Sequence, residues 1–310
     1  GDPGNANDDT GYGAVGYEYQ IGKYEVTIGQ YTDFLNAAAK SDPYSLYNPS
    51  MASDLNIAGI SRSGTSGGYS YSVINNGGPS GNRPITYVSW FDAARFANWM
   101  QNGQGSGSTE TGAYTLVGGQ TSGTAPAKNP GAQFYIPTEN EWYKAAYYSP
   151  VLNSGSGGYY TYATQSNTAP GNVVGSSANL ANYNNGVYSV TQSASYSGSQ
   201  NYLTDVGAFA NSASYYGTFD QSGNASEWND LTGAAHSYRG IRGYGWYPDG
   251  FPPPEENYYR WMLENVVFTG YMDGFRLAAP VAVPEPSTYA MALAGLGFTG
   301  YSMFRRRKRA

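Results

Sequence analysis

The chain has 310 residues, with 16 Lys and Arg against 22 Asp and Glu, a single His and no Cys. The missing cysteine excludes disulfide frameworks, cysteine-ligated metal centres and thiol nucleophiles, and His236 alone excludes a His-rich metal cluster. Only 12% of residues are charged while 16% are aromatic, so the surface is rich in Ser, Thr, Asn, Gly and Tyr, as in extracellular, sugar-rich settings. The 42 Gly and 17 Pro predict many turns and a loop-rich α+β domain with short helices.

The net charge of −6 is unevenly distributed along the chain. Five of the 16 basic residues lie at 305–309, and Glu285 is the only acidic residue beyond position 283. Residues 1–283 therefore carry 11 positive and 21 negative charges. Such an acidic body argues against nucleic-acid binding, which requires a basic surface.

The first predicted elements are a strand and a helix. Alternation of Tyr17, Tyr19 and Ile21 with polar neighbours predicts a strand within Gly16–Val26. Thr27 and Gln30 form the pattern of a capping box, which opens a predicted helix at Ile28–Ala39. The Ser-, Gly- and Asn-rich stretch at 52–82 has no helical period and is predicted to be a long surface loop.

Two further helices are predicted downstream. A short strand at 83–90 leads to a helix at Trp90–Met100, capped by Ser89 and ending at Asn102-Gly103. A second capping box, Thr138 to Glu141, opens a helix at Glu139–Tyr148. Residues 151–201 have a loop composition.

Several segments occur in the order found in one protein family. They are Ile21–Thr27, Arg83–Trp90 with Ala93–Phe96, Ile136–Trp142, Gly217–Trp228, Arg239–Gly243 and Gly274–Arg276. Over about residues 16–279 the chain resembles the formylglycine-generating enzyme, or sulfatase-modifying factor, family. The resemblance implies an α+β, C-type-lectin-like formylglycine-generating-enzyme fold, loop-rich with short helices and small antiparallel sheets.

The family's enzymes use a pair of copper-binding cysteines that lies between the Arg-Gly strand and the final Gly-Phe-Arg. Here the corresponding interval, Tyr244 to Asp273, contains no Cys. Carboxylates and indoles do not replace thiolates on Cu(I), so no copper and no family oxidase activity are expected. We expect a protein that is not an enzyme.

The resemblance also implies calcium sites. Asp220, Gly223, Ala225 and Glu227 match a family site in which side-chain and backbone oxygens surround a structural calcium ion, and hard Ca²⁺ prefers such ligands. The alternative is a tight turn into a core strand, with Glu227 capping backbone amides and Trp228 packed inward. A second family site would begin at Asn182-Tyr183, although its downstream aspartate is missing here.

Ten aromatic residues lie in the interval 244–275. In this fold the segment before Gly-Phe-Arg lines a substrate groove or a ligand-display surface, and exposed Tyr and Trp supply rigid contact area. The alternative is that many of them fill a core poor in aliphatic residues. The residues predicted to contact a ligand, around the turn-forming prolines, are Trp246, Tyr247, Phe251, Tyr258 and Tyr259.

The C-terminus combines three features in order. Pro284-Glu285-Pro286 precedes the uncharged, largely apolar stretch Thr288–Phe304, and the cations at 305–309 follow. The 17-residue stretch is just long enough to span a bilayer, and the following cations place residues before Pro284 outside the cell. The alternative is a buried C-terminal helix. The order resembles the PEP-CTERM sorting signal of exported bacterial proteins, which implies processing by an exosortase and an association with exopolysaccharide and the cell surface.

These observations predict an extension at 1–15, one domain at 16–280 and a sorting tail at 281–310. Because the chain begins at Gly1 in a polar segment, we expect a processed or trimmed start. The leading interpretation is an exported, non-catalytic cell-surface or matrix protein that binds a polysaccharide or another surface protein, with the membrane contacted only through the tail. The alternatives are self-association into a surface layer or filament, and an enzyme of altered chemistry that rests only on acidic side chains.

Overall fold

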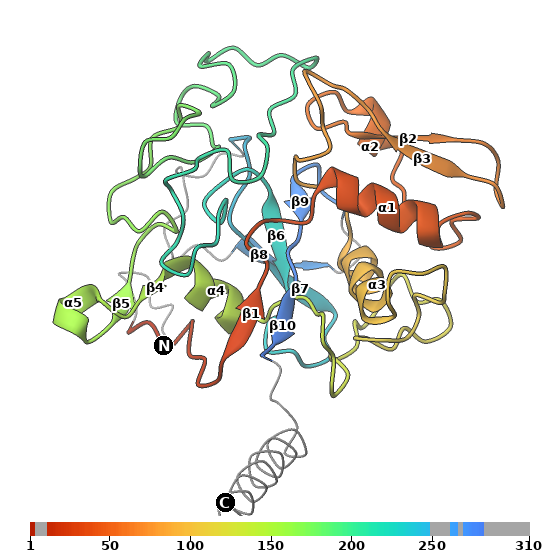
Figure 1. The fold of residues 1–310 in the computed structure, drawn as a ribbon, viewed down its shortest axis with the longest axis horizontal. Coiled ribbons are helices and arrows are strands. Elements are labelled where there is room, and N and C mark those ends of the chain that lie inside the picture. Colours follow the sequence, from red (N-terminus) through yellow and green to blue (C-terminus); the bar gives the residue numbers. More distant parts are fainter. Residues whose placement is uncertain (4–10, 249–260, 266–268, 282–310) are drawn as a thin grey trace, which may run out of the picture. The chain divides into compact units, whose positions relative to one another are not determined.

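The computed structural model describes residues 1–3, 11–248, 261–265 and 269–281. The chain divides into two compact units, Gly1–Ala279 and Pro280–Ala310. The first unit holds short helices and small sheets joined by long loops (Figure 1). This arrangement is the loop-rich α+β organisation that the composition predicts.

Three helices of the body begin where the sequence predicts. They are α1 (Ile28–Ala38), α3 (Trp90–Gln101) and α4 (Glu139–Tyr147). Each opens with a complete capping box, in which the N-cap hydroxyl accepts from the N3 amide and the N3 side chain accepts from the N-cap amide. Asp92 completes the box of α3, so this carboxylate is a specific cap as well as a favourable first-turn charge. Two single-turn helices, α2 (Ser50–Ser53) and α5 (Leu152–Gly155), lie in loop regions.

The main sheet has four strands in the order β8 (Trp261–Asn265), β7 (Tyr238–Arg242), β6 (Ser226–Asn229) and β9 (Asp273–Gly274). β6 runs antiparallel to β7 and parallel to β9, and β7 runs antiparallel to β8. All four residues of β6 are buried, as expected for a strand covered on both faces. Figure 1 shows α4 on one side of this sheet and α1 with α3 on the other.

Smaller two-stranded sheets surround the main one. They are β1 (Tyr19–Ile21) with β10 (Ala278–Pro280), β2 (Ile60–Ser63) with β3 (Ser70–Val73), and β4 (Tyr148–Ser149) with β5 (Gly158–Tyr159). Aromatic side chains fill much of the space between these elements. Phe96 of α3, for example, packs edge-on against Phe34 of α1 at 5.4 Å and against Phe275 at 5.3 Å between ring centroids.

Buried ion pairs tie the main sheet to its neighbours. Arg239 of β7 pairs with Asp230 at 2.7 Å, and Arg242 of β7 pairs with Glu139 of α4. All four of these residues are buried. Removing one partner of such a pair leaves an uncompensated charge in the interior, so these contacts fix which elements pack together.

Three sequence predictions need correction. The strand predicted at 83–90 does not form, because in this segment only Pro84 takes part in a β-bridge, an isolated one with Thr27. The stretch at 52–82 is not a plain loop, because Ile60–Ser63 and Ser70–Val73 pair as an antiparallel hairpin. The hairpin is held by Asn36 of α1, whose amide donates to the Tyr71 carbonyl at 2.8 Å and accepts from the Tyr71 amide at 3.0 Å. The strand predicted within Gly16–Val26 is regular only at Tyr19–Ile21.

Candidate functional site

The loop Asp220–Glu227, predicted to hold calcium, forms a tight turn that leads into β6. Asp220 and Asn224 adopt left-handed backbone angles with φ of 61° and 67°, and Gly223 has φ of 124°. A Cβ atom on Gly223 would lie 2.4 Å from the Asn182 carbonyl oxygen, so only glycine fits here. The Asn224 amide donates to that same oxygen at 2.8 Å. The two segments predicted as separate calcium sites therefore lie against each other.

Tyr183, the other residue of the second predicted site, is buried. Its hydroxyl donates to the Pro170 carbonyl, and its amide donates to the Ser189 hydroxyl at 3.0 Å. Ala225 is buried immediately before β6. Both residues thus occupy structured positions in the core around the turn.

The Glu227 carboxylate is already bound on both oxygens. Arg276 donates to each oxygen at 2.5 Å, and the Trp142 indole donates to Oε2 at 2.9 Å. Arg276 also donates to the Gly22 carbonyl at 3.0 Å and to the Phe219 carbonyl at 2.8 Å. A calcium ion on this carboxylate would have to displace a buried guanidinium, so the Glu227 side chain does not fit the predicted ligand set. The alternative prediction, a tight turn in which Glu227 caps backbone amides, also differs from the structure, because the partners of Glu227 are side chains.

Asp220 lies beside the same cluster of charges. Its Oδ2 accepts from the Gly207 amide at 2.6 Å. Burial raises the pKa of Asp220 to about 6, and burial together with the charge of Asp220 raises the pKa of Glu25. In the described part of the chain, no three His, Asp or Glu side chains converge as metal ligands. Calcium binding by the remaining oxygens of this loop stays a prediction.

The aromatic residues of the interval 244–275 differ in their exposure to solvent. Trp246 is only 2% exposed, so the prediction that its ring contacts a ligand directly is wrong: other rings cover it. Tyr247 is half-buried, while Phe251, Tyr258 and Tyr259 lie outside the described residues. Trp246 and Tyr247 belong to a larger group, here named the aromatic cluster, made of Tyr188, Tyr196, Tyr202, Trp246, Tyr247 and Tyr271.

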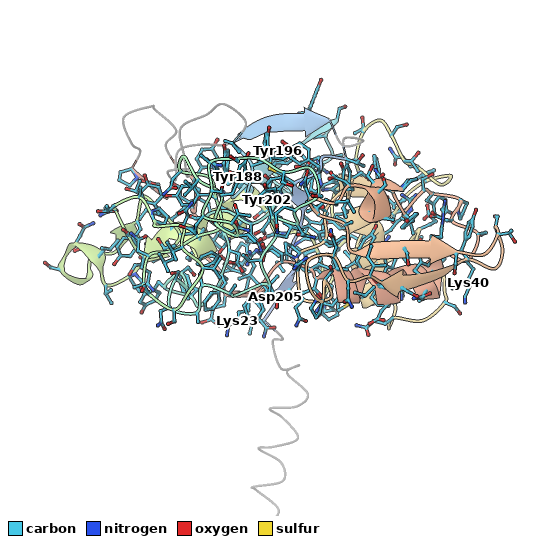
Figure 2. All side chains as sticks on the ribbon, turned by 90° about the horizontal axis from the view of Figure 1, so that it is seen from above. Lys23, Lys40, Tyr188, Tyr196, Tyr202 and Asp205 are labelled. Carbon is cyan, nitrogen blue, oxygen red and sulfur yellow. The ribbon has the colours of Figure 1, made fainter. Side chains whose placement is uncertain are left out.

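The outermost ring of the aromatic cluster belongs to Tyr196, which lies outside the predicted ligand-binding residues. Its side chain is 52% exposed and stacks on Tyr202 with an interplanar angle of 15°. Tyr202 in turn stacks on Trp246 at 4.7 Å and 11°. Figure 2 shows Tyr188, Tyr196 and Tyr202 together on one side of the body, with Lys23 and Asp205 on the other. The three stacked rings form a column that ends at the surface.

The Tyr196 ring is held in place by hydrogen bonds. Its hydroxyl donates to the Asn56 side-chain oxygen, and the Asn56 amide group donates to the carbonyls of Ser197 and Gln200, each at 2.8 Å. Asn56 is therefore saturated and fixes both the ring and the loop that carries it. The only signal in the sequence was a Tyr in a run of Ser and Gly, which does not distinguish this position from other exposed tyrosines.

Next to the aromatic cluster is a cavity of about 400 Å³, lined by residues that include Asp42, Tyr47, Arg62, Tyr69 and Tyr87. Tyr87 also packs against the aromatic cluster and so connects the two features. It has a left-handed φ of 60°, a conformation that costs a bulky residue about 1 to 3 kcal/mol. Two contacts hold it there: its amide donates to Gly270 O at 3.1 Å, and its hydroxyl donates to Asp54 at 2.8 Å.

The predicted sorting signal Pro284-Glu285-Pro286 lies outside the described residues. Within residues 1–3, 11–248, 261–265 and 269–281, no helix combines the length and the apolar composition that crossing a membrane requires.

The family model of the sulfatase-modifying factor enzyme 1-like domain matches residues 14–280, and the chain belongs to this family. The predicted loop-rich α+β fold of this family is thereby confirmed. The chain contains no cysteine, so the catalytic cysteine pair of the family is missing. No curated protein matches the chain.

A second family model, the PEP-CTERM protein-sorting motif, matches residues 282–308. This match confirms the resemblance that the tail shows in the sequence. The protein is accordingly exported and anchored at the cell surface through its C-terminal tail, and its sorting depends on an exosortase.

Three solved structures are similar to the chain at low identity. CarF is 21% identical, with a TM-score of 0.48 and coverage of 85% of this chain and 87% of that chain. Treponema denticola variable protein 1 is 18% identical, with a TM-score of 0.46 and coverage of 85% and 84%. PvdO from Pseudomonas aeruginosa is 20% identical, with a TM-score of 0.42 and coverage of 85% and 80%.

Proposed function

We propose that this exported protein binds a cell-surface or matrix polysaccharide on the aromatic cluster without chemically changing it. The observation that carries the proposal is the half-exposed Tyr196 ring at the end of the Tyr202–Trp246 stack. Pyranose rings present a face of C–H groups, which packs well on a flat aromatic ring. An exported chain anchored at the cell surface meets such polymers.

The cluster is organised before any ligand arrives. The hydrogen bonds from Tyr196 to Asn56 and from Asn56 to two loop carbonyls remove the freedom that a surface tyrosine ordinarily has. A side chain immobilised in advance loses less conformational entropy on binding, typically about 0.5 to 1.5 kcal/mol per side chain. Rigid Tyr side chains are for this reason effective contact residues.

Absence of catalysis is the second part of the proposal. The chain lacks the cysteine pair of its family. Two glutamates at the start of α4 are engaged in structural contacts: Glu139 pairs with Arg242, and Glu141 caps α4 and accepts from the Tyr135 hydroxyl at 3.0 Å. Buried carboxylates with such partners are poorly placed to attack a glycosidic bond.

The test compares Tyr196→Ala with Tyr238→Ala on a panel of immobilised polysaccharides, using the full chain in mild detergent. Tyr238 is a matched control, because it is 44% exposed and, within the described residues, His236 is the only aromatic ring paired with it. We expect Tyr196→Ala to weaken polysaccharide binding about tenfold or more, which corresponds to the loss of about 1.4 kcal/mol of binding free energy at a contact residue. Tyr238→Ala should bind as tightly as the unmodified protein. Equal retention by the two variants would refute a role for the aromatic cluster. Concentration-dependent polymers without glycan retention would favour the self-assembly alternative.

A further inference from the structure

The described arginines differ in how fully they are engaged. Arg83, Arg95, Arg239, Arg242 and Arg276 are all buried. Arg62 differs from them because its side chain is 28% exposed and lines the cavity beside the aromatic cluster. Its ion pair with Asp42 measures 3.4 Å, longer than the other ion pairs of the described residues.

The Arg62 guanidinium contacts two aromatic rings. Its central carbon lies 4.7 Å from the centroid of Tyr47 and 4.4 Å from that of Tyr69. These two cation–π contacts hold the charged group without using its N–H donors, which lie in the guanidinium plane. The group is thus fixed in orientation while hydrogen-bonding capacity remains for a partner.

Asp42 engages few of the N–H donors of the Arg62 guanidinium. The carboxylate accepts from the Leu46 amide at 2.7 Å and from the Tyr47 amide at 3.3 Å, and Nη1 of Arg62 is the guanidinium nitrogen that reaches it. A guanidinium has five N–H donors in a planar fork. Asp42 is therefore satisfied mainly by backbone, and the Arg62 fork still has donors to offer in the cavity.

The other nearby carboxylate is also occupied. Asp54 accepts from the Tyr87 hydroxyl at 2.8 Å and from the Asn56 backbone amide at 3.1 Å. Both contacts reduce the negative potential that an incoming anion would meet. Tyr87 lines the cavity and also packs against the aromatic cluster, so the two features share a side chain.

We propose that Arg62 binds the carboxylate of an acidic sugar, and that the polysaccharide recognised by this protein contains uronic acid residues. This inference rests on the proposed function and specifies its ligand class. A carboxylate accepts two parallel hydrogen bonds from the planar guanidinium of an arginine, a geometry that the ammonium group of a lysine does not provide. A polysaccharide is favoured over an acidic peptide because the aromatic column next to the cavity suits the flat faces of sugar rings.

The test uses polygalacturonate and its fully methyl-esterified form, which share a backbone and differ in charge. The full chain is titrated with each polymer in chelator, so that calcium does not cross-link the acid form. We expect about tenfold or tighter binding of polygalacturonate, consistent with a charge-assisted hydrogen-bonded pair. We also expect that Arg62→Gln removes this preference. The control Lys23→Gln removes one exposed cation on the side of the body opposite Tyr188, Tyr196 and Tyr202 (Figure 2) and should keep the preference.

The outcomes separate the inference from the function on which it rests. Equal binding of both polymers, with both lost in Tyr196→Ala, would overturn the Arg62 inference and leave polysaccharide binding intact. Binding of poly-L-glutamate as tight as that of polygalacturonate would also overturn it, in favour of an acidic peptide. Retention of no polymer at all would reject the proposed function as well. If Arg62→Gln fails to fold, the comparison of the two polymers on the unmodified protein still decides whether the uronic acid carboxylate is recognised.

Discussion

Replacing Glu227 with Ala tests what this side chain does in the core. The substitution leaves the Arg276 guanidinium, which is 0% exposed, without its carboxylate, and it leaves the Trp142 indole without its acceptor. A lone buried charge costs about 3 to 5 kcal/mol, and an unsatisfied buried donor about 1 to 3 kcal/mol. Arg276 keeps the Gly22 and Phe219 carbonyls as acceptors, which places the expected loss near the lower end, at about 4 kcal/mol.

In a domain of this size, 1 kcal/mol shifts the melting temperature by about 2 to 4 °C, so a decrease of roughly 10 °C is expected. The assay is thermal unfolding of the full chain, followed by near-ultraviolet circular dichroism, with excess calcium and separately with chelator. Because the ion pair is internal, Glu227→Ala should lose the same stability in both conditions. The exposed Glu18→Ala should change it by less than about 0.5 kcal/mol.

A loss confined to the calcium sample would refute this reasoning. It would mean that Glu227 binds the ion, as the motif predicts, and that the contact with Arg276 is secondary. An equal loss would leave calcium to the other oxygens of the loop. A wild-type melting temperature independent of calcium would then argue against calcium at Asp220–Glu227 altogether.

Three further predictions concern stability and location. Gly223→Ala should destabilise the fold by several kcal/mol in urea unfolding, because the new Cβ would lie 2.4 Å from the Asn182 carbonyl oxygen. The control Gly217→Ala, at φ of 80° with open space around it, should cost only about 1 kcal/mol. Equal losses in the two variants would contradict this prediction. Burial raises the pKa of Asp92 to about 6, above its unfolded value, so the contribution of this group to stability is complete below about pH 4 and is lost as the pH rises through 6. Asp92→Asn should reduce the fall in unfolding free energy over that range by up to about 1.4 kcal/mol per pH unit, and an unchanged slope in urea titrations would contradict the assignment. Deleting residues 282–310 should release the protein from membranes into the medium, and unchanged membrane fractionation would contradict the sorting match.

The helices could be predicted because their signals are local. Thr27 with Gln30, Ser89 with Asp92, and Thr138 with Glu141 each lie three residues apart and satisfy one another. The hairpin at 60–73 could not be predicted, because its register depends on Asn36, 35 residues away from Tyr71. Its strands are Ser-rich and bury few side chains, so periodicity gives no signal.

The candidate site was harder to predict for the same reason. The motif placed Glu227 at the end of a tight turn, but its partner Arg276 lies 49 residues later, and the motif carries no information about that pairing. Trp246 was singled out by composition, yet burial is decided by Tyr188 and Tyr202, which pack on it from a distant loop. The roles proposed for Tyr196 and Arg62 depend on neighbours that the fold brings to them.

The most direct test of polysaccharide binding without catalysis is a titration of the full chain with soluble bacterial exopolysaccharides, followed by mass analysis of the recovered polymer. The account predicts saturable binding to at least one polymer, with its chain length and composition unchanged. Cleaved or modified polymer would contradict the absence of catalysis. No binding to any polymer, together with concentration-dependent assembly in sedimentation velocity, would contradict the binding function itself.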